Sequence, residues 1–283
     1  MKRIYTKNEL KSVLDKERKI GRTIGLVPTM GALHEGHASL VRRSVMENDV
    51  TVVSVFLNPT QFNDKKDLEK YPRTLEADCL LLQACGADIV FAPSVEEMYP
   101  EPDNRHFSYP PTDCVMEGVF RPGHFNGVCQ IVSKLFLLTM PHRAYFGEKD
   151  FQQIAVIRRM VDDLDLQLEI VSCPVVREEG GLAMSSRNTL LTKDERQIAN
   201  HIYKTLVESK EWAKDKPLHE VHNRVVEEID RMPGLKVQYY SIVDGHTLAE
   251  LGEWTDSNDI VGCITVFCGN QPVRLIDHIR YKG

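Results

Sequence analysis

A strand, a short polar turn and a helix start follow one another between residues 23 and 46, and this unit limits the possible folds more than any other stretch. The apolar run at 23–27 is typical of a buried strand. The turn after it carries His34 and His37, and the segment at 38–46 has a helical pattern. A strand that turns into a helix start presents free backbone N–H groups and the positive end of a helix dipole. The sequence therefore predicts an anion-binding site at this turn.

The chain continues as alternating strands and helices, which is the pattern of an α/β protein. A near-continuous apolar run at 50–57 suits a central parallel strand that is covered on both faces. Further strands are expected at 88–93, 143–147 and 166–173, and helices at 7–19, 74–85, 128–139 and 151–162. Because ligands bind at the carboxyl ends of such strands, we expect a Rossmann-like parallel sheet with its site at that edge.

The texture of the sequence changes near residues 174–180. Two charged helices are expected after this point and then three β-rich segments, at 192–213, 217–231, 237–243, 260–267 and 273–279. Consecutive helices followed by consecutive strands indicate a separate α+β module. We predict a Rossmann-like domain at 1–176 and a smaller α+β lid domain at 177–283.

Composition excludes several classes of protein. A net charge of −6 argues against broad binding to nucleic acid. No apolar run is long enough to span a membrane, and the charged start of the chain lacks the apolar segment of a secretory signal. The seven cysteines form no Cys-x-x-Cys pair and suit a reducing compartment. We expect a cytoplasmic protein that binds neither nucleic acid nor membrane.

The histidine pair allows two interpretations. His34 and His37 could bind a metal, but they lack His-Glu-x-x-His spacing and no third ligand is evident. On a glycine-bearing strand-to-helix turn, phosphate binding is the better interpretation. A charged imidazole, or a neutral one that donates a hydrogen bond, would stabilise the charge on a leaving pyrophosphate.

Two further segments have the chemistry of phosphate ligands. Lys149 follows an expected buried strand, where its compact ammonium suits a phosphate, although a solvated surface lysine is the default. The segment at 184–188 is either a polar linker or a mobile clamp whose hydroxyls and guanidinium donate to a triphosphate. Each signal is weak alone, but their order along an α/β chain favours a nucleotide site.

Amides and apolar residues near the strand ends predict a second, less charged subsite. The amides are Asn58, Gln61, Gln152 and Gln153. Gln152 fits a structural role equally well, whereas Gln61 and Gln153 suit a hydroxylated small molecule. Pro28, Met30 and Phe62 could form an apolar wall beside them.

Three carboxylates could lie beside a Mg²⁺ ion. They are Asp78, Asp88 and Asp150. For Asp78, a solvated side chain is the favoured interpretation.

The ordered motifs resemble those of a known family. The segment 34–37 is similar to the HIGH signature of the nucleotidyltransferase superfamily, which includes class I aminoacyl-tRNA synthetases, and 184–187 is similar to its KMSKS signature. More specifically, six segments resemble the pantothenate synthetase (pantoate–β-alanine ligase) family: 28–37, 58–62, 71–73, 121–125, 146–150 and 181–188. The resemblance runs from about residue 24 to residue 190.

The resemblance implies an AMP-forming ligase that acts in two steps on the route to coenzyme A. ATP and pantoate give pantoyl adenylate, and β-alanine then attacks it to give pantothenate and AMP. The implied catalytic residues are His37, His34, Lys149 and Arg187. The implied ATP contacts are Met30, Gly31, Ala32, Leu33, His34, Glu35, Gly36, His37, Gly147, Glu148, Lys149, Asp150, Val176, Met184, Ser185, Ser186 and Arg187.

The resemblance further assigns Gln61, Gln153 and Asn58 to pantoate or β-alanine. Mg²⁺ is expected to accompany the phosphates, without assigned ligands, and the protein is expected to be a cytoplasmic homodimer. One position departs from the family pattern, because Gly180 stands where Asp is usual. This removes a carboxylate and predicts a more flexible hinge at Gly180 and Gly181.

Two other functions stay open at this point. A nucleotidyltransferase acting on a phosphorylated substrate would need additional basic residues where Gln61 and Gln153 stand. An ATP-binding sensor without catalysis would show damage at His37, Lys149 or Arg187, and all three are present. A small protein like a tRNA synthetase is disfavoured by the acidic charge balance and by the lack of an anticodon-binding extension.

Overall fold

The computed structural model, which describes residues 1–63, 68, 69 and 71–283, confirms a Rossmann-like parallel sheet. Its six strands are β1 (Lys2–Ile4), β2 (Ile24–Thr29), β3 (Val50–Val55), β4 (Ile89–Phe91), β5 (Arg143–Gly147) and β6 (Glu169–Cys173). All neighbouring pairs are parallel, in the order β1-β4-β3-β2-β5-β6. From β2 the chain moves to β3 on one side and later to β5 on the other. The order therefore reverses between β2 and β5, where α/β sheets bind ligands.

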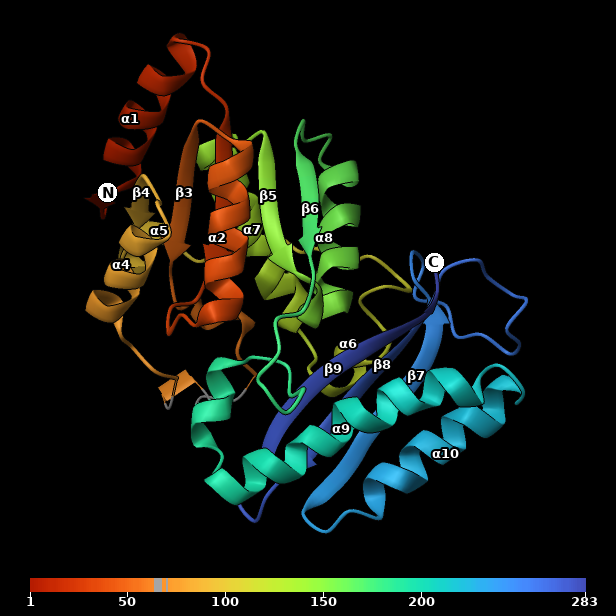
Figure 1. Ribbon diagram of the computed structural model, residues 1–283. Helices are drawn as coiled ribbons and strands as arrows, with labels where there is room; N and C mark the ends of the chain where they lie inside the picture. Colours follow the sequence, from red (N-terminus) through yellow and green to blue (C-terminus); the bar gives the residue numbers. More distant parts are fainter. Residues whose placement is uncertain (64–67, 70) are drawn as a thin grey trace.

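Helices cover both faces of this sheet (Figure 1). One core lies under α1 (Lys7–Lys19), α7 (His124–Thr139) and α8 (Phe151–Asp163). A second core lies under α2 (Glu35–Glu47) and α4 (Leu75–Ala84). Two short helices, α5 (Val95–Met98) and α6 (Glu117–Phe120), interrupt the loop before α7. Burial of both faces explains why the central strands are apolar along their whole length.

A smaller sheet follows near the carboxyl ends of the parallel strands (Figure 1). It is antiparallel and contains β7 (Leu235–Asp244), β8 (Ile260–Cys268) and β9 (Val273–Lys282). The helices α9 (Lys193–Trp212) and α10 (Leu218–Asp230) share its main core. A separate cluster joins Val243, Val261 and Cys263 to Met116 and Ala155 of the first part. The predicted division at residues 176 and 177 falls between β6 and α9 and stays a prediction.

Strand β1 was not predicted from the sequence, and the predicted starts of two helices were wrong. Strand β1 has only three residues, and its first two are exposed, so it carries almost no apolar pattern. Helix α2 begins at residue 35 instead of 38 because His34 caps it, and α7 begins at 124 instead of 128 after the left-handed Gly123.

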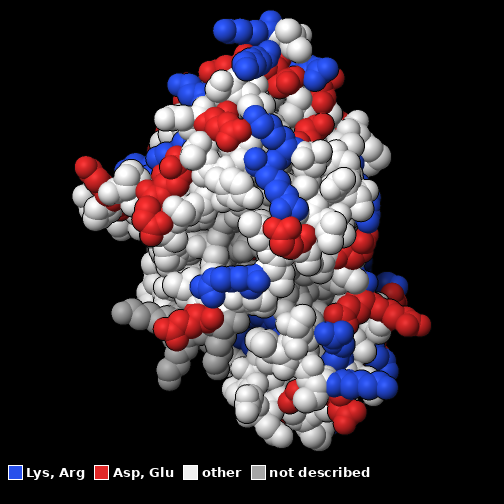
Figure 2. Space-filling view, turned by 90° about the vertical axis from the view of Figure 1, so that its left-hand side faces the viewer, with Lys and Arg blue, Asp and Glu red and all other residues white. Residues whose placement is uncertain are grey.

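Two further properties of the molecule are the character of its helices and the distribution of charge on its surface. No helix within the described residues is long and apolar enough to cross a membrane. On the face shown in Figure 2, basic and acidic side chains are interspersed, and the surface is hollowed between the upper and lower parts of the molecule.

Candidate active site

The two histidines form the first turn of α2 and share one protonation pattern. His34 Nδ1 accepts a hydrogen bond from the Gly36 N–H at 3.1 Å, and His37 Nδ1 accepts one from the His34 N–H at 3.3 Å. A neutral ring that accepts at Nδ1 carries its proton on Nε2. Both rings therefore hold an Nε2–H donor for a ligand, and their centroids lie 4.1 Å apart.

Both rings are neutral at physiological pH. Burial, reinforced by the Lys149 charge, lowers the pKa of His34 to about 4. Burial, together with His34 and Lys149, lowers the pKa of His37 to about 3. Of the two forms predicted for this pair, the structure supports the neutral imidazole that donates a hydrogen bond.

A carboxylate from α4 holds the turn in front of these histidines. Asp78 is 2% exposed, and its two oxygens accept from the Ala32 N–H at 3.1 Å and the Leu33 N–H at 2.8 Å. Gly31 and Ala32 have φ values of 86° and 51°, a tight left-handed bend that this carboxylate stabilises. The expectation of a solvated Asp78 was wrong. Its alternative, a carboxylate beside a Mg²⁺ ion, stays a prediction, although both oxygens already accept from backbone N–H groups.

The Asp88 carboxylate likewise binds a backbone N–H group, away from the site. It directly precedes β4, and its Oδ2 accepts from the Thr51 N–H at 2.8 Å near the amino-terminal end of β3. That is the opposite edge of the sheet from the histidines, so Asp88 is no candidate for Mg²⁺ at the site.

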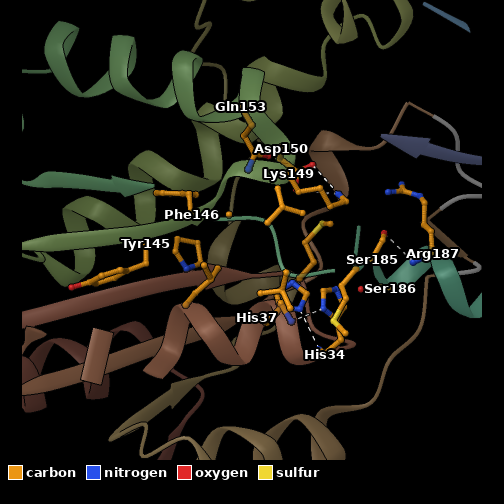
Figure 3. A pocket seen from close by; sticks show the side chains of 18 of the residues that line it. His34, His37, Tyr145, Phe146, Lys149, Asp150, Gln153, Ser185, Ser186 and Arg187 are labelled. Atoms are coloured by element: carbon orange, nitrogen blue, oxygen red, sulfur yellow. Dashed lines mark hydrogen bonds and ion pairs between the residues drawn. The ribbon is translucent and has the colours of Figure 1, made fainter. Parts of the chain in front are cut away.

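Lys149 and Asp150 form a short 3₁₀ turn, η2 (Glu148–Asp150), directly after β5. Lys149 Nζ lies 3.4 Å from Asp150 Oδ2. Burial raises the pKa of Asp150, but Lys149 and Arg187 outweigh it, so the pKa falls below its usual value and the group is a carboxylate. This ion pair lies across the cavity from the histidines (Figure 3).

The segment around Ser185 closes the third side of this cavity (Figure 3). Ser185 caps the 3₁₀ helix η3 (Ser186–Leu190), and its Oγ accepts from the Arg187 N–H at 3.3 Å. Ser186 Oγ donates to the Ala32 carbonyl at 3.0 Å. The motif segments 28–37 and 181–188, far apart in the sequence, are therefore in direct contact.

A first cavity lies between these three segments. It is lined by most of the predicted nucleotide contacts: Met30, His34, Gly36, His37, Gly147, Lys149, Asp150, Val176, Met184, Ser185, Ser186 and Arg187. Gly31, Ala32, Leu33, Glu35 and Glu148 are not among its lining residues. The first three form the turn that Asp78 holds, and Glu35 pairs with Arg42 on the outer side of α2.

A second cavity adjoins the first. Both are lined by Met30, His37, Asp150, Gln153 and Arg187. Its wall includes the three residues predicted to be apolar neighbours, Pro28, Met30 and Phe62, and also Gln61 and Asn58. A ligand in the second cavity can therefore reach one in the first without leaving the protein.

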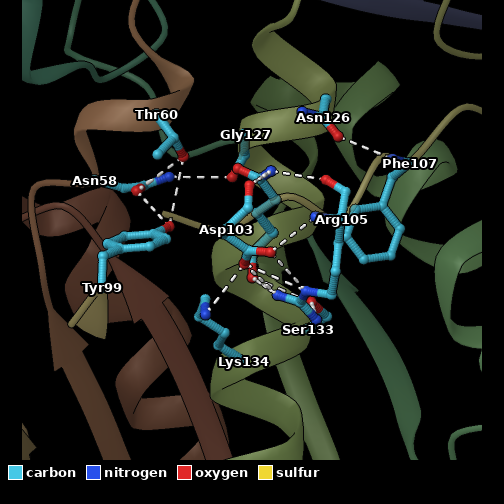
Figure 4. A network of polar contacts seen from close by, with 11 residues as sticks. Asn58, Thr60, Tyr99, Asp103, Arg105, Phe107, Asn126, Gly127, Ser133 and Lys134 are labelled. Atoms are coloured by element: carbon cyan, nitrogen blue, oxygen red, sulfur yellow. Dashed lines mark hydrogen bonds and ion pairs between the residues drawn. The ribbon is translucent and has the colours of Figure 1, made fainter. Parts of the chain in front are cut away.

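Hydrogen bonds fix the orientation of the Gln61 amide through Asn58. Figure 4 shows the polar contacts of Asn58 with Thr60, Tyr99 and Gly127. Asn58 Nδ2 donates to the Gly127 carbonyl and to Gln61 Oε1, both at 3.1 Å. Asn58 Oδ1 accepts from Tyr99 Oη at 2.8 Å and from Thr60 Oγ1 at 3.1 Å. Since Gln61 Oε1 is taken, its Nε2 is left to donate; it lies 3.0 Å from Met30 Sδ. The hydrogen-bonding capacity of Asn58 is filled by protein groups, which points to a positioning role.

The two neighbouring glutamines on α8 have different surroundings. Gln152 is buried, and its amide bonds to the Thr112 and Val115 carbonyls and to the Glu117 N–H, so the structural interpretation was right. Gln153 lines both cavities and makes no side-chain hydrogen bond within the described part of the chain.

Arg121 and His124, in the 121–125 motif, line the second cavity, although no role was predicted for either of them. His124 Nδ1 lies 2.9 Å from the Gln61 carbonyl and its Nε2 lies 3.1 Å from Arg121 Nη1. A carbonyl only accepts and a guanidinium only donates, so the neutral His124 ring carries its proton on Nδ1. The sequence signal that could have pointed to them is Gly123, because a glycine in a polar turn before a helix is readily recognised in a sequence.

At Gly180, the side chain of a neighbouring helix fills the space that a Cβ would need. A Cβ at Gly180 would lie 2.0 Å from Asn200 Nδ2, so the Asn200 side chain of α9 occupies that space. Of the two hinge glycines, Gly180 and Gly181, only Gly181 has a positive φ, of 97°. The predicted flexibility of this hinge stays a prediction.

No group of three or more His, Cys, Asp or Glu side chains is placed to hold a metal within residues 1–63, 68, 69 and 71–283. The metal-pair interpretation of the histidines therefore finds no third ligand there. Mg²⁺ commonly binds to one or two carboxylates and to substrate phosphates. The Asp150 carboxylate, in the wall of both cavities, fits that mode.

Comparisons with known proteins agree with this geometry. The model of the pantoate-β-alanine ligase family matches residues 2–280. A pantothenate synthetase of Bacteroides thetaiotaomicron is 63% identical over all of this chain and 99% of its own. The crystal structure of pantothenate synthetase from Thermus thermophilus is 42% identical, covers both chains completely and has a TM-score of 0.93.

A ligase from Francisella tularensis is similar over nearly the whole chain as well. It is a pantoate-β-alanine ligase whose crystal structure contains β-γ ATP and β-alanine. It is 35% identical, covers 99% of this chain and 98% of its own, and has a TM-score of 0.82.

Proposed function

The chain belongs to the pantoate-β-alanine ligase family, and from that premise we propose that it condenses pantoate with β-alanine, using ATP and forming a pantoyl adenylate on the way. The observation that carries the proposal is the pair of adjoining cavities. One is lined by cationic and hydroxyl donors suited to phosphates. The other shares Asp150 and Arg187 with it, and adds neutral amides, apolar side chains and Arg121. This is the arrangement that an acid and a nucleotide need in order to react with each other.

In the first step, the triphosphate lies in the first cavity. We assign its contacts to the Nε2–H groups of His34 and His37, to Lys149, and to Ser185, Ser186 and Arg187. The pantoate carboxylate, held by Gln61 and Gln153, attacks the α-phosphorus, and the bond from that phosphorus to pyrophosphate breaks. The protein acts by positioning the reactants and neutralising charge on the leaving pyrophosphate.

In the second step, the amine of β-alanine attacks the acyl carbon of the adenylate. A C–N bond forms, the bond from the acyl carbon to the AMP oxygen breaks, and AMP leaves. Adenylation makes this possible because AMP is a far better leaving group than the oxygen of a free carboxylate. The boundary between the two cavities, where His37 and Gln153 line both, is the place for this exchange.

Mg²⁺, when bound, neutralises phosphate charge, and Asp150 is the carboxylate that would hold it. We also propose a homodimer in the cytoplasm. Its mass in solution, measured by light scattering, should be twice that of one chain.

The observed second cavity disfavours transfer of a nucleotide to a phosphorylated substrate. Such a substrate would need unpaired basic residues there. Two arginines line this cavity. Arg187 is assigned to the triphosphate above, and Arg121 Nη1 lies 3.6 Å from Glu117 Oε2, whose negative charge offsets its own.

The direct test is AMP formation from ATP with purified protein and Mg²⁺. We expect AMP and pantothenate in equal amounts only when pantoate and β-alanine are both supplied. Folded protein that forms no AMP under these conditions, or forms it equally well without β-alanine in repeated turnover, would refute the proposed function.

A further inference from the structure

Glu117 is a buried carboxylate at the joint between the two sheets. It is 7% exposed and begins the short helix α6, between the first part of the chain and the small sheet. Each strand of the small sheet gives it one donor. These are Tyr239 Oη of β7 at 2.8 Å, Thr265 Oγ1 of β8 at 3.1 Å, and the Arg274 guanidinium of β9 at 2.6 and 2.7 Å.

The same carboxylate faces the second cavity through Arg121. Arg121 Nη1 lies 3.6 Å from Glu117 Oε2 and also donates to His124 Nε2 at 3.1 Å. His124 in turn donates from Nδ1 to the Gln61 carbonyl at 2.9 Å. An unbroken series of polar contacts therefore runs from the three strands of the small sheet to the backbone of Gln61.

The negative charge of Glu117 compensates the positive charges of the arginines in this series. Burial raises the pKa of Glu117, but hydrogen bonding and charge from Arg274 outweigh it and hold the pKa at about 2, so the group is ionised. It lies between two guanidiniums, Arg121 and Arg274. Without its negative charge these two buried cations would repel each other, and breaking a buried pair from one side is costly. Arg121 would then lose its fixed position next to His124.

We propose that Glu117 is a positioning residue for the acyl substrate, which ties the carboxy-terminal sheet to Gln61 through Arg121 and His124. The inference rests on the proposed function, because Gln61 is the residue assigned there to pantoate. It predicts that damage to this carboxylate acts on pantoate binding rather than on ATP binding. The nucleotide contacts lie in other parts of the chain, at 30–37, 147–150, 176 and 184–187.

The test is a comparison of steady-state kinetics for Glu117→Gln and wild type. We expect the KM for pantoate to rise at least about tenfold, while the KM for ATP changes less than about threefold. A KM for pantoate within about twofold of wild type would overturn the inference. Inactive wild-type protein would instead refute the proposed function, so the two failures are distinguishable.

A matched pair on one strand separates positioning from general loss of stability. Tyr239 and Tyr240 are neighbours on β7, but Tyr239 Oη donates to Glu117 whereas Tyr240 Oη bonds to Tyr281 inside the carboxy-terminal part. Tyr239→Phe should raise the KM for pantoate, and Tyr240→Phe should leave it unchanged even where it lowers the free energy of unfolding. Equal effects of the two substitutions on this KM would contradict the inference.

The ring of His124 gives a readout that a purely structural role of Glu117 would not move. In wild type, the ¹⁵N resonances should report a single Nδ1-protonated tautomer. In Glu117→Gln, the Gln61 carbonyl still holds the proton on Nδ1, but the loss of the fixed Arg121 donor should shift the resonance of the accepting Nε2. An unchanged Nε2 resonance in a folded Glu117→Gln protein would also count against the proposed connection.

Discussion

Three histidines serve this site in two different tautomers. His34 and His37 accept from backbone N–H groups at Nδ1 and keep their Nε2–H donors, whereas His124 donates from Nδ1 to a carbonyl. Burial lowers the pKa of all three, with the charge of Arg121 adding to the effect on His124, whose pKa is about 4. Each therefore stays neutral at physiological pH and offers a defined donor.

These lowered pKa values predict acid sensitivity of the fold. Between the unfolded pKa of 6.5 and the folded value of about 4, the unfolded chain binds a proton on His124 that the folded chain does not. Stability therefore falls as the pH falls through this window. Replacing His124 with Gln should reduce the slope of the free energy of unfolding against pH by up to one proton, about 1.4 kcal/mol per pH unit.

Urea unfolding at several pH values within that window measures the slope. His219→Gln, at an exposed position on α10, is the matched control and should keep the wild-type slope. Parallel curves for wild type and His124→Gln would show that His124 binds its proton equally well in both states.

At the scale of elements, the histidine turn depends on a helix that contributes nothing to the cavity walls. Helix α4 supplies Asp78, which binds two consecutive N–H groups of the turn between β2 and α2. Those N–H groups are therefore not available to a phosphate. In the proposed function, the anion is therefore bound by side chains, chiefly the two histidines.

Asp78→Asn should disturb this turn, because an amide offers one acceptor oxygen where the carboxylate offers two. One buried N–H is then left without a partner, which costs about 1–3 kcal/mol in the free energy of unfolding. The KM for ATP should rise as well, since the turn carries His34. Chemical denaturation and steady-state kinetics measure the two effects.

Glu76→Gln on the same helix is the control. The Glu76 side chain is 78% exposed and pairs with Arg3 at the surface. Its loss should change stability by less than about 1 kcal/mol. Similar effects of the two substitutions would show that Asp78 has no special part in holding the turn.

At the scale of the whole molecule, the site lies where the sheet order reverses and where the carboxy-terminal part meets the first. Among the contacts that cross from later segments into the amino-terminal part, two lie beside the site: Ser186 with the Ala32 carbonyl, and the small sheet with Glu117. The nucleotide side and the acyl side of the site are therefore each in contact with a later part of the chain.

Sequence patterns predicted which residues line the site better than they predicted which residues hold those residues in place. Buried apolar runs located the strands, and parallel strands bring their carboxyl ends together, so His37, Lys149 and Gln61 could be expected at one edge. Asp78 and Glu117 could not be assigned, because a single carboxylate looks alike whether it is solvated or buried. Its partners lie far along the chain, and only the packed structure selects them.

The central claim is that pantoate is activated by ATP at the junction of the two cavities before β-alanine reacts. The most direct measurement is exchange of labelled pyrophosphate into ATP. We predict exchange that requires pantoate and proceeds without β-alanine, and that falls at least about tenfold in His37→Ala, equivalent to roughly 1.4 kcal/mol of barrier. Exchange that proceeds without pantoate, or that His37→Ala leaves at the wild-type rate, would contradict the account.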